Sequence, residues 1–519
     1  MSGRGRLFLL FLGWPVALVT PTGPSMSDSV LLAAIRLVDD RTWTLSDERD
    51  PKVVFLTEAF DISVHGQRIY SGVGPGASVV AAPFYLALKP VLACFDGRII
   101  QNRRLLNYYV PNRRAMDRPV PGRLKDVYLL QVFLAWIVVA PVLASFLVRL
   151  HGRLTDHGFA EAHANAITLA VGIGSMALYY SSMYSRQALA YGLAWHAVLF
   201  LMGSRDQPAP SPVAALGAGT LLGAAIAIDY AAAILVALSL LFLLPRLPAA
   251  ARLLTLAALG VMLGLLALYH EHAFGSPWAT PYHFRFWFTA EPLARQGIDL
   301  AAFQQGPALG MNGPSLAVML RLCFGTFKGL FVYSPLLLAG LLGHLAGLRD
   351  PRCRTFHVYC LLVFLCTLTF NSTLGTHVPE YGRHFWGGLS VLWGPRYLYG
   401  VVPFLAVGLV RLDWRRRATR ILCGGLLLVG CVFNLLGAMF SDVVMSTSAF
   451  GPELRSPLAY VMRLLLLRGP RVPMLDVYGV APAAQWAVLL ALAAASALML
   501  GQGGVASPSS RYTAHGPAA

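Results

Sequence analysis

Residues 213–245 read VAALGAGTLLGAAIAIDYAAAILVALSLLFLLP, an apolar run in which Asp229 is the one charged residue. A helix that crosses a bilayer needs about 20 apolar residues, so this run is too long for one span. The charge near its middle marks the point where the chain turns back. We therefore predict a tight pair of membrane helices that meet at Asp229-Tyr230.

The rest of the chain has the same apolar character. Of its 519 residues, 56% are hydrophobic and only 13% are charged. This excludes a soluble protein, because a single core could not bury so much apolar surface. We predict an all-α, multi-pass membrane protein with about twelve spans. Besides the pair within 213–245, the predicted spans are residues 5–21, 127–148, 164–182, 187–203, 251–270, 329–347, 355–371, 396–411, 420–440 and 482–500.

The distribution of arginine predicts the orientation in the membrane, because cytoplasmic loops are rich in basic residues. All the short basic loops fall on one side only if the apolar segment 77–95 does not cross. We predict that 77–95 is a re-entrant or juxtamembrane helix on the outer face, which Pro83 and Pro90 favour. Both termini are then cytoplasmic, and residues 22–126, 271–328, 372–395 and 441–481 are outer loops. The basic segments used are Arg4 and Arg6, Arg149 and Arg153, Arg205, Arg246 and Arg252, and residues 349–354 and 411–420.

The chain is predicted to form one multispanning domain over residues 1–500, followed by a disordered cytoplasmic tail, 501–519, rich in Gly, Ser, Pro and Ala. The first segment has the order of a signal peptide, but Asp28 follows so closely that we favour an uncleaved span. The composition, rich in alanine and arginine, suits a bacterial inner (plasma) membrane. Of the seven cysteines, Cys94 and Cys323 are both predicted outside and could pair.

The net charge of +17 is mostly the cytoplasmic bias already described. Residues 98–125 are the exception, because this basic stretch lies in an outer loop. It could bind anionic lipid or lipid-phosphate headgroups, or it could be a solvated loop. Nucleic acid is not expected as a partner, since the basic residues are scattered over separate loops without a binding module.

Asp28 follows the first span and precedes the helical stretch Val30–Val38. An aspartate at a helix start is often a cap. A carboxylate at the dry edge of a membrane can also take a proton from a hydroxyl nucleophile. The sequence alone leaves both interpretations open.

Other outer segments bring polar groups to the same side of the membrane. Arg396, at the mouth of a predicted span, could hold a phosphate by a forked contact or could simply reach the interface from a helix end. His270 and His272 are two apart on a helix and point different ways, so a shared metal is not expected. The remaining polar positions are Tyr184, Arg186, Gln187, Tyr230, Glu271, His377, Glu380, Arg383 and His384.

The order of several motifs resembles the GT-C superfamily of membrane glycosyltransferases, which includes the protein mannosyltransferases and the lipid A aminoarabinose transferases. The resemblance covers roughly residues 5–440. The motifs up to Tyr85 resemble the amino-terminal half of these enzymes, and the later ones resemble motifs of uncharacterised bacterial members. The motifs are Asp28 after the first span, Thr42-Trp43-Thr44-Leu45-Ser46-Asp47, Gly66 to Ser71 leading into Gly74-Pro75-Gly76, Ala81 to Tyr85, Tyr184 to Ala190, Phe274-Gly275-Ser276-Pro277, Gly329 to Pro335 and Trp386 to Tyr397.

This resemblance implies an inverting transfer of a sugar from a polyprenyl-phosphate donor to a lipid, glycan or protein acceptor at the outer face, for the cell envelope. Asp28 corresponds to the acid that activates the acceptor, and residues 70–95 correspond to the lipid entry path. Arg396, aided by Arg186, would neutralise the departing phosphate. The residues assigned to substrate binding are Tyr70, Arg186, Arg383, His384, Arg396 and Tyr397.

The chain departs from the family pattern at two places. Family members often have Asp-Glu after the first span, where this chain has Asp28-Ser29, and many carry a second acid after the third span, where it has Arg186-Gln187. These departures leave open whether a divalent cation takes part. They also keep two alternatives: a transporter or flippase of a lipid-linked or anionic solute, although no internally repeated halves are visible, and an inactive scaffold for envelope assembly.

Overall fold

The computed structural model describes residues 3–20, 25–45, 62–65, 68–95, 122–203, 210–286, 313–374, 386–387, 393–441, 456–477 and 479–501. Within these ranges, six helical stretches are long and apolar enough to cross a membrane. The chain is therefore a multi-pass membrane protein, as predicted, while the number of about twelve spans stays a prediction. The six stretches are α4 (Gly76–Cys94), residues 126–156 in α7 (Gly122–Leu134), η2 (Ala135–Val139) and α8 (Ala140–Asp156), α14 (Ala249–Phe274), α20 (Arg354–Ser372), α23 (Arg417–Met439) and α27 (Pro482–Gly501).

The predicted break into two helices at Asp229 is confirmed, while their crossing of the membrane stays a prediction. Helix α12 (Pro212–Ile228) ends where Asp229 takes an extended backbone conformation, and α13 begins at Ala232 and runs to Leu243. Two glycines let α12 pack tightly on α14: an added Cβ at Gly219 would collide with the carbonyl of Thr255, and one at Gly223 with the side chain of Met262. Small residues at such contacts allow membrane helices to approach closely.

Two predicted spans are each broken into shorter helices. Residues 164–182 form α9 (Glu161–Gly172) and α10 (Ala177–Ser181), and 329–347 form α18 (Leu330–Tyr333) and α19 (Leu336–Gly347). The second break falls at Pro335, whose ring prevents an uninterrupted helix. The other described helices are α1 (Gly3–Ala17), α11 (Arg186–Leu201), η3 (Leu244–Arg246), η4 (Pro281–Phe284), α17 (Leu316–Phe324), η6 (Arg396–Val401), α22 (Val402–Val407), η7 (Gly408–Arg411), α25 (Pro457–Arg468) and α26 (Pro473–Val477).

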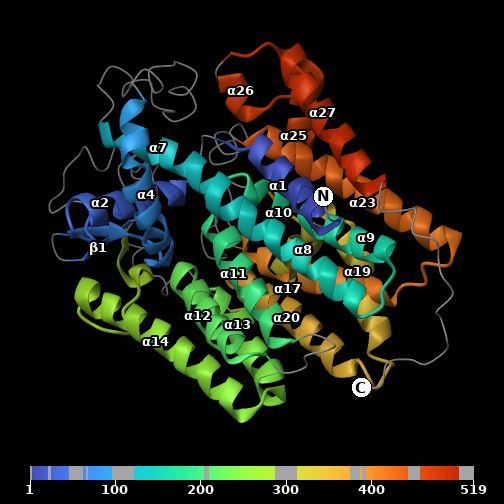
Figure 1. Ribbon diagram of the computed structural model, residues 1–519, viewed down its shortest axis with the longest axis horizontal. Helices are drawn as coiled ribbons and strands as arrows, with labels where there is room; N and C mark the ends of the chain where they lie inside the picture. The colour runs from blue at the N-terminus through green and yellow to red at the C-terminus, as the bar shows by residue number, and fades with distance from the viewer. Residues whose placement is uncertain are drawn as a thin grey trace.

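A small sheet lies at one end of the helix bundle and was not predicted. Its strand order is β2-β1-β3, all antiparallel, formed by β1 (Ile62–His65), β2 (Arg68–Ser71) and β3 (Arg285–Phe286). Helix α2 (Ser25–Asp39) packs on α4 beside it, and α2, α4 and β1 gather at the left of Figure 1. The long helices α8, α14, α23 and α27 run roughly parallel to one another away from this end. The fold is thus helical, with a small sheet that completes one end.

One further prediction is wrong, and others are not tested by the structure. Cys94 is exposed, Cys323 is buried and both are free thiols, so the suggested pairing is wrong. Helix α4 contains Pro83 and Pro90, as its sequence indicated, and its position relative to the membrane stays a prediction. Residues 502–519 and most of the basic stretch 98–125 lie outside the described residues.

Candidate functional site

The site begins with a buried pair between the start of α11 and the α12–α13 turn. Ser185 caps α11, its hydroxyl accepting a hydrogen bond from the amide of Ala188. This places Arg186 and Gln187 in the first turn of the helix, facing Asp229. Arg186 is 5% exposed and Asp229 is 2% exposed, so both charged groups are shut away from water.

The Asp229 carboxylate is well supplied with donors. Its Oδ2 accepts a hydrogen bond from Nε2 of Gln187 at 3.0 Å, and its Oδ1 accepts one from the amide of Ala231 at 3.1 Å. Nε of Arg186 lies 3.6 Å from Oδ2, which is an ion pair but too long for a good hydrogen bond. The turn therefore fixes Asp229 firmly, and Asp229 in turn holds Arg186 in place.

The guanidinium of Arg186 has more hydrogen-bond donors than its described neighbours use. Its guanidinium donates to the hydroxyl of Tyr282, which follows α14. Burial raises the pKa of Tyr282 to about 12, so this partner is a neutral phenol. Among the described residues, Nε and Nη1 of Arg186 have no hydrogen-bond partner. A buried guanidinium with unfilled donors is suited to an anionic ligand that arrives from outside.

Arg396 and Tyr397, the first two residues of η6, lie near Arg186. Arg396 is 2% exposed; its Nη2 donates to the hydroxyl of Tyr397 at 2.8 Å, and its guanidinium carbon lies 4.7 Å from the centre of the same ring. Tyr397 lies within electrostatic reach of Arg186. The segment is anchored by Nε1 of Trp195, which donates to the carbonyl of Gly400 at 3.0 Å. Three of the residues assigned to substrate binding, Arg186, Arg396 and Tyr397, are thus brought together.

Sequence reasoning missed Lys328, which joins this group. It lies between α17 and α18, is 0% exposed, and its Nζ lies 4.5 Å from the ring centre of Trp386. Burial holds the pKa of Lys328 well below its usual range, and the charge of Arg396 lowers it further. A signal was present: this lysine immediately precedes the motif Gly329 to Pro335. We call Arg186, Lys328, Arg396 and Tyr397 the cationic cluster.

The cationic cluster has an excess of basic groups. Among the described residues it gathers three buried basic side chains: Arg186 pairs with the carboxylate of Asp229, and Lys328 lies within electrostatic reach of Arg396. Cations buried at this density repel one another, so an anion between them would be strongly stabilised. The arrangement predicts a site for a phosphate or another compact anion.

The glycine tract Gly72 to Gly76, which leads into α4, docks directly beside the cationic cluster. An added Cβ at Gly74 would collide with the carbonyl oxygen of Ala227, and one at Gly76 would lie 2.7 Å from the amide nitrogen of Ile228. The hydroxyl of Tyr184 donates to the carbonyl of Ala77 at 2.6 Å. The tract therefore lies against the end of α12, just before Asp229.

This docking predicts a large effect of adding one methyl group. Gly74→Ala should destabilise the protein by about 1–3 kcal/mol, because backbone atoms of α12 cannot move aside as a side chain can. Thermal unfolding of the purified protein in detergent measures the effect. The matched control is Gly217→Ala within α12, where an added Cβ meets nothing within 4 Å; that variant should be as stable as the wild type or slightly more stable. Equal unfolding temperatures for wild type and Gly74→Ala would contradict the tight contact.

Asp28 lies in α2, the helix that packs on α4. Helix α2 begins at Ser25, three residues before Asp28, so Asp28 is not the residue that caps this helix. The next residue, Ser29, forms a hydrogen bond of 3.0 Å with Ser71 at the start of the glycine tract. The backbone at Asp28 is thereby tied to the segment that packs beside the cationic cluster. The Asp28 side chain lies outside the described residues, so its role stays a prediction.

The other assigned residues lie apart from the cationic cluster or cannot be placed. Tyr70 is buried in an aromatic group with Trp43, Tyr269 and Phe274, where its ring centre lies 5.3 Å from that of Phe274. This group joins the sheet to the end of α14. Arg383 and His384 lie outside the described residues. Within the described residues, no three His, Cys, Asp or Glu side chains come together as metal ligands.

Neither a family model nor a curated protein matches this sequence. One solved structure is similar, the crystal structure of ArnT from Cupriavidus metallidurans bound to undecaprenyl phosphate. The identity is 14% and the TM-score 0.42, and the match covers 96% of this chain and 77% of ArnT.

Proposed function

We propose that this protein is a glycosyltransferase that moves a sugar from a polyprenyl-phosphate donor to an acceptor at the outer face of the membrane, with inversion. The observation that supports this most is the buried cationic cluster, where Arg186 pairs with Asp229 but keeps unfilled donors, and where Arg396 and Lys328 are also buried. A phosphate is the anion that forked guanidinium contacts fit best. The motifs that resemble GT-C enzymes are the reason to propose that this phosphate carries a sugar.

The position of the cationic cluster on helix α11 indicates which side of the membrane the cluster faces. Arg186 is at its first residue, whereas Leu199, near its other end, accepts a hydrogen bond from Arg153 in the last turn of α8, next to a predicted cytoplasmic loop. Thirteen residues of helix separate these positions, or roughly 20 Å. If the basic loops face the cytoplasm, the cationic cluster lies toward the outer face, where the sugar of a flipped lipid donor would be presented.

The donor lipid would approach along α4. This helix exposes Val79, Leu86 and Val91, while its N-terminal end packs beside the cationic cluster through Gly76 and Ala77. An exposed apolar helix face that ends beside a buried basic group suits a polyprenyl chain with a phosphate at its end. The polyprenyl chain would stay in the bilayer while its phosphate reaches Arg186 and Arg396.

The proposed reaction is a single displacement. The acceptor hydroxyl gives its proton to Asp28 while its oxygen attacks the anomeric carbon from the face opposite the phosphate. The bond between the anomeric carbon and the phosphate oxygen breaks, and the phosphate leaves with the electron pair. Arg186 and Arg396 stabilise the charge that develops on it, a role in which fixed donors contribute most.

A second function uses the same residues differently. The interrupted pair α12–α13 carries the buried Arg186–Asp229 ion pair at its break, and such breaks line pathways in transporters. A flippase would hold the lipid phosphate at the cationic cluster during passage without cleaving the sugar from it. The two functions differ in one product, the free polyprenyl phosphate.

The test compares lipid-linked sugars and envelope glycans by mass spectrometry in cells that lack the protein and in cells that regain it. A transferase predicts that one lipid-linked sugar accumulates and one glycan lacks a sugar residue, and that the wild-type protein restores both. The purified protein in vesicles should also release polyprenyl phosphate in the presence of donor and acceptor. Movement of the donor across the vesicle bilayer without any release would instead favour the flippase, and unchanged profiles would exclude both.

The lowered pKa of Lys328 predicts a pH dependence. Only the protonated amine attracts an anion, so the affinity for polyprenyl phosphate should fall as pH rises through the lowered pKa, well before an ordinary lysine would titrate. Lys328→Met should remove this part of the dependence and keep the titration of the ligand itself. Binding curves from about pH 6 to about pH 10 measure it, with Lys89→Met, an exposed lysine paired with Asp39, as control. Identical pH profiles for wild type and Lys328→Met would exclude Lys328 from phosphate binding.

A further inference from the structure

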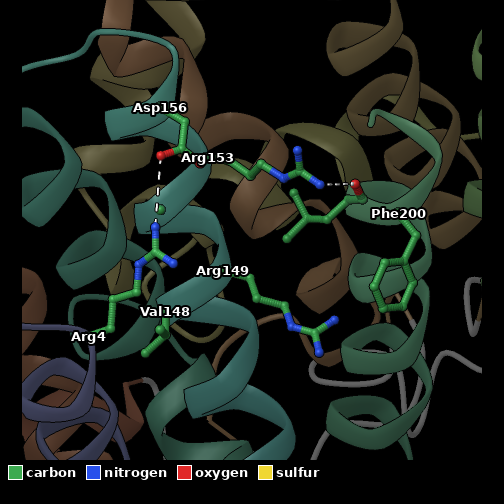
Figure 2. A pocket seen from close by; sticks show the side chains of 8 residues that line it. Arg4, Val148, Arg149, Arg153, Asp156 and Phe200 are labelled. Atoms are coloured by element: carbon green, nitrogen blue, oxygen red, sulfur yellow. Dashed lines mark hydrogen bonds and ion pairs between the residues drawn. The ribbon is translucent and has the colours of Figure 1, made fainter. Parts of the chain in front are cut away.

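A second group of basic residues lines a cavity at the other end of α11. Arg149 and Arg153 of α8 are four residues apart and therefore share a face of the helix. Figure 2 shows both side chains reaching from α8 toward Phe200 of α11, with Arg4 of α1 on the other side of α8 beside Asp156. The cavity that they enclose has a volume of about 270 Å³. This is near the lower end of the range of small-ligand sites, about 300 Å³.

The contacts of these arginines leave positive charge unneutralised. Asp156 is the one carboxylate that lines the cavity, and it lies 3.8 Å from Nη2 of Arg4, a weak contact between exposed groups. The guanidinium of Arg149 lies over the ring of Phe200 at 4.9 Å. Nη2 of Arg153 donates to the carbonyl of Leu199 at 3.5 Å, the limit of a hydrogen bond. Among the described residues, three arginines and one acid thus line the cavity.

Arg153 also has a donor that nothing in the described part of the chain fills. Its Nη1 is buried and makes no hydrogen bond there. A buried donor without an acceptor costs free energy unless a ligand supplies one. Arg149 and Arg153, on the same helix face, could both donate to the oxygens of one phosphate group. Their forked geometry suits that ligand better than the point charge of a lysine does.

We propose that this cavity binds the phosphate of an anionic phospholipid in the leaflet opposite the cationic cluster. Helix α1 beside it exposes the apolar residue Leu9, so a headgroup in the cavity can keep its acyl chains in the bilayer. Basic cavities between membrane helices at the cytoplasmic side are suited to such headgroups. The proposal does not depend on the reaction at the cationic cluster.

Basic residues at this end also serve as the topological signal used above, and the test separates the two roles. Thermal unfolding of the purified protein is followed in detergent with added phosphatidylglycerol, phosphatidylcholine or inorganic phosphate. Phosphatidylglycerol should raise the unfolding temperature of the wild type, and Arg149→Gln/Arg153→Gln should abolish that shift. The apparent affinity for phosphatidylglycerol should fall about tenfold for each arginine that is replaced. Arg149→Lys/Arg153→Lys keeps the charge and should regain part of the shift.

The matched control is Arg415→Gln/Arg417→Gln, which removes the same charge from exposed positions in another basic segment. It should respond to phosphatidylglycerol as the wild type does. If both Gln pairs abolish the shift equally, or if phosphatidylcholine acts as well as phosphatidylglycerol, the cavity is no specific site and the proposal fails. If inorganic phosphate at the same concentration gives the full shift, the ligand is a soluble phosphate and the lipid assignment fails.

Discussion

Replacing Arg396 with glutamine should slow sugar transfer by about 100- to 1,000-fold, the usual cost of removing one fixed donor from a developing charge. Arg396 is 2% exposed and shares the cationic cluster with Arg186 and Lys328. Glutamine fills much of the same space but carries no charge and cannot neutralise the leaving phosphate. The rate of polyprenyl phosphate release by the protein in vesicles measures the effect at saturating donor and acceptor.

Two further variants make this result specific. Arg396→Lys keeps the charge but lacks the planar fork, so it should recover part of the rate and not all of it. Arg321→Gln removes an exposed arginine from the last turn of α17, close in sequence to Lys328, and should keep the wild-type rate. If Arg396→Gln folds and transfers sugar as the wild type does, the phosphate is not held at the cationic cluster.

The helix pair at Asp229 could be predicted because one charge in a long apolar run is a strong local signal. Arg186 and Arg396 could be assigned for a similar reason: each stands at the end of an apolar segment, where charged residues are few. Helices in a membrane begin and end close to its two faces, so residues at helix ends on one side are brought near each other. That rule, together with the family resemblance, selected Arg186, Arg396 and Tyr397, and their role in binding stays a prediction.

The small sheet could not be predicted from local pattern. Strand β1 has four residues and β3 has two, which is too short for an alternation to be visible. Ser63 pairs with Arg285, so the contact spans more than two hundred residues of sequence. The burial of Lys328 is likewise tertiary: its Nζ lies 4.5 Å from the ring centre of Trp386, much further along the chain.

The sequence did not reveal which residues contact Asp229. The resemblance leads one to expect an acid where this chain has Arg186-Gln187. In the structure both of those side chains contact Asp229, which comes from a different helix pair. An acid therefore does lie beside the start of α11, but it arrives from another part of the chain. Its hydrogen bonds and its ion pair suit it to holding Arg186 rather than to taking up a proton.

Replacing Asp28 with asparagine should lower the rate of transfer by about 100- to 10,000-fold, the range that general base catalysis contributes. Asparagine is nearly the same size but cannot accept the proton of the acceptor hydroxyl. Binding of polyprenyl phosphate should stay unchanged, because that depends on the cationic cluster. Asp40→Asn is the matched control, since Asp40 follows the same helix and pairs with Arg36 at its far end; it should keep the wild-type rate. A wild-type rate for well-folded Asp28→Asn would show that Asp28 is not the base.

The pH dependence distinguishes Asp28 from Asp229, the other acid near the site. A general base must be deprotonated to act, so the wild-type rate should fall at low pH as Asp28 becomes protonated. Asp28→Asn should lack this acid limb in whatever activity remains. Asp229→Asn should instead weaken donor binding by loosening Arg186 and keep the acid limb, because Asp229 positions an arginine and takes no proton from the acceptor. If the acid limb disappears in Asp229→Asn and persists in Asp28→Asn, the base lies on the α12–α13 turn.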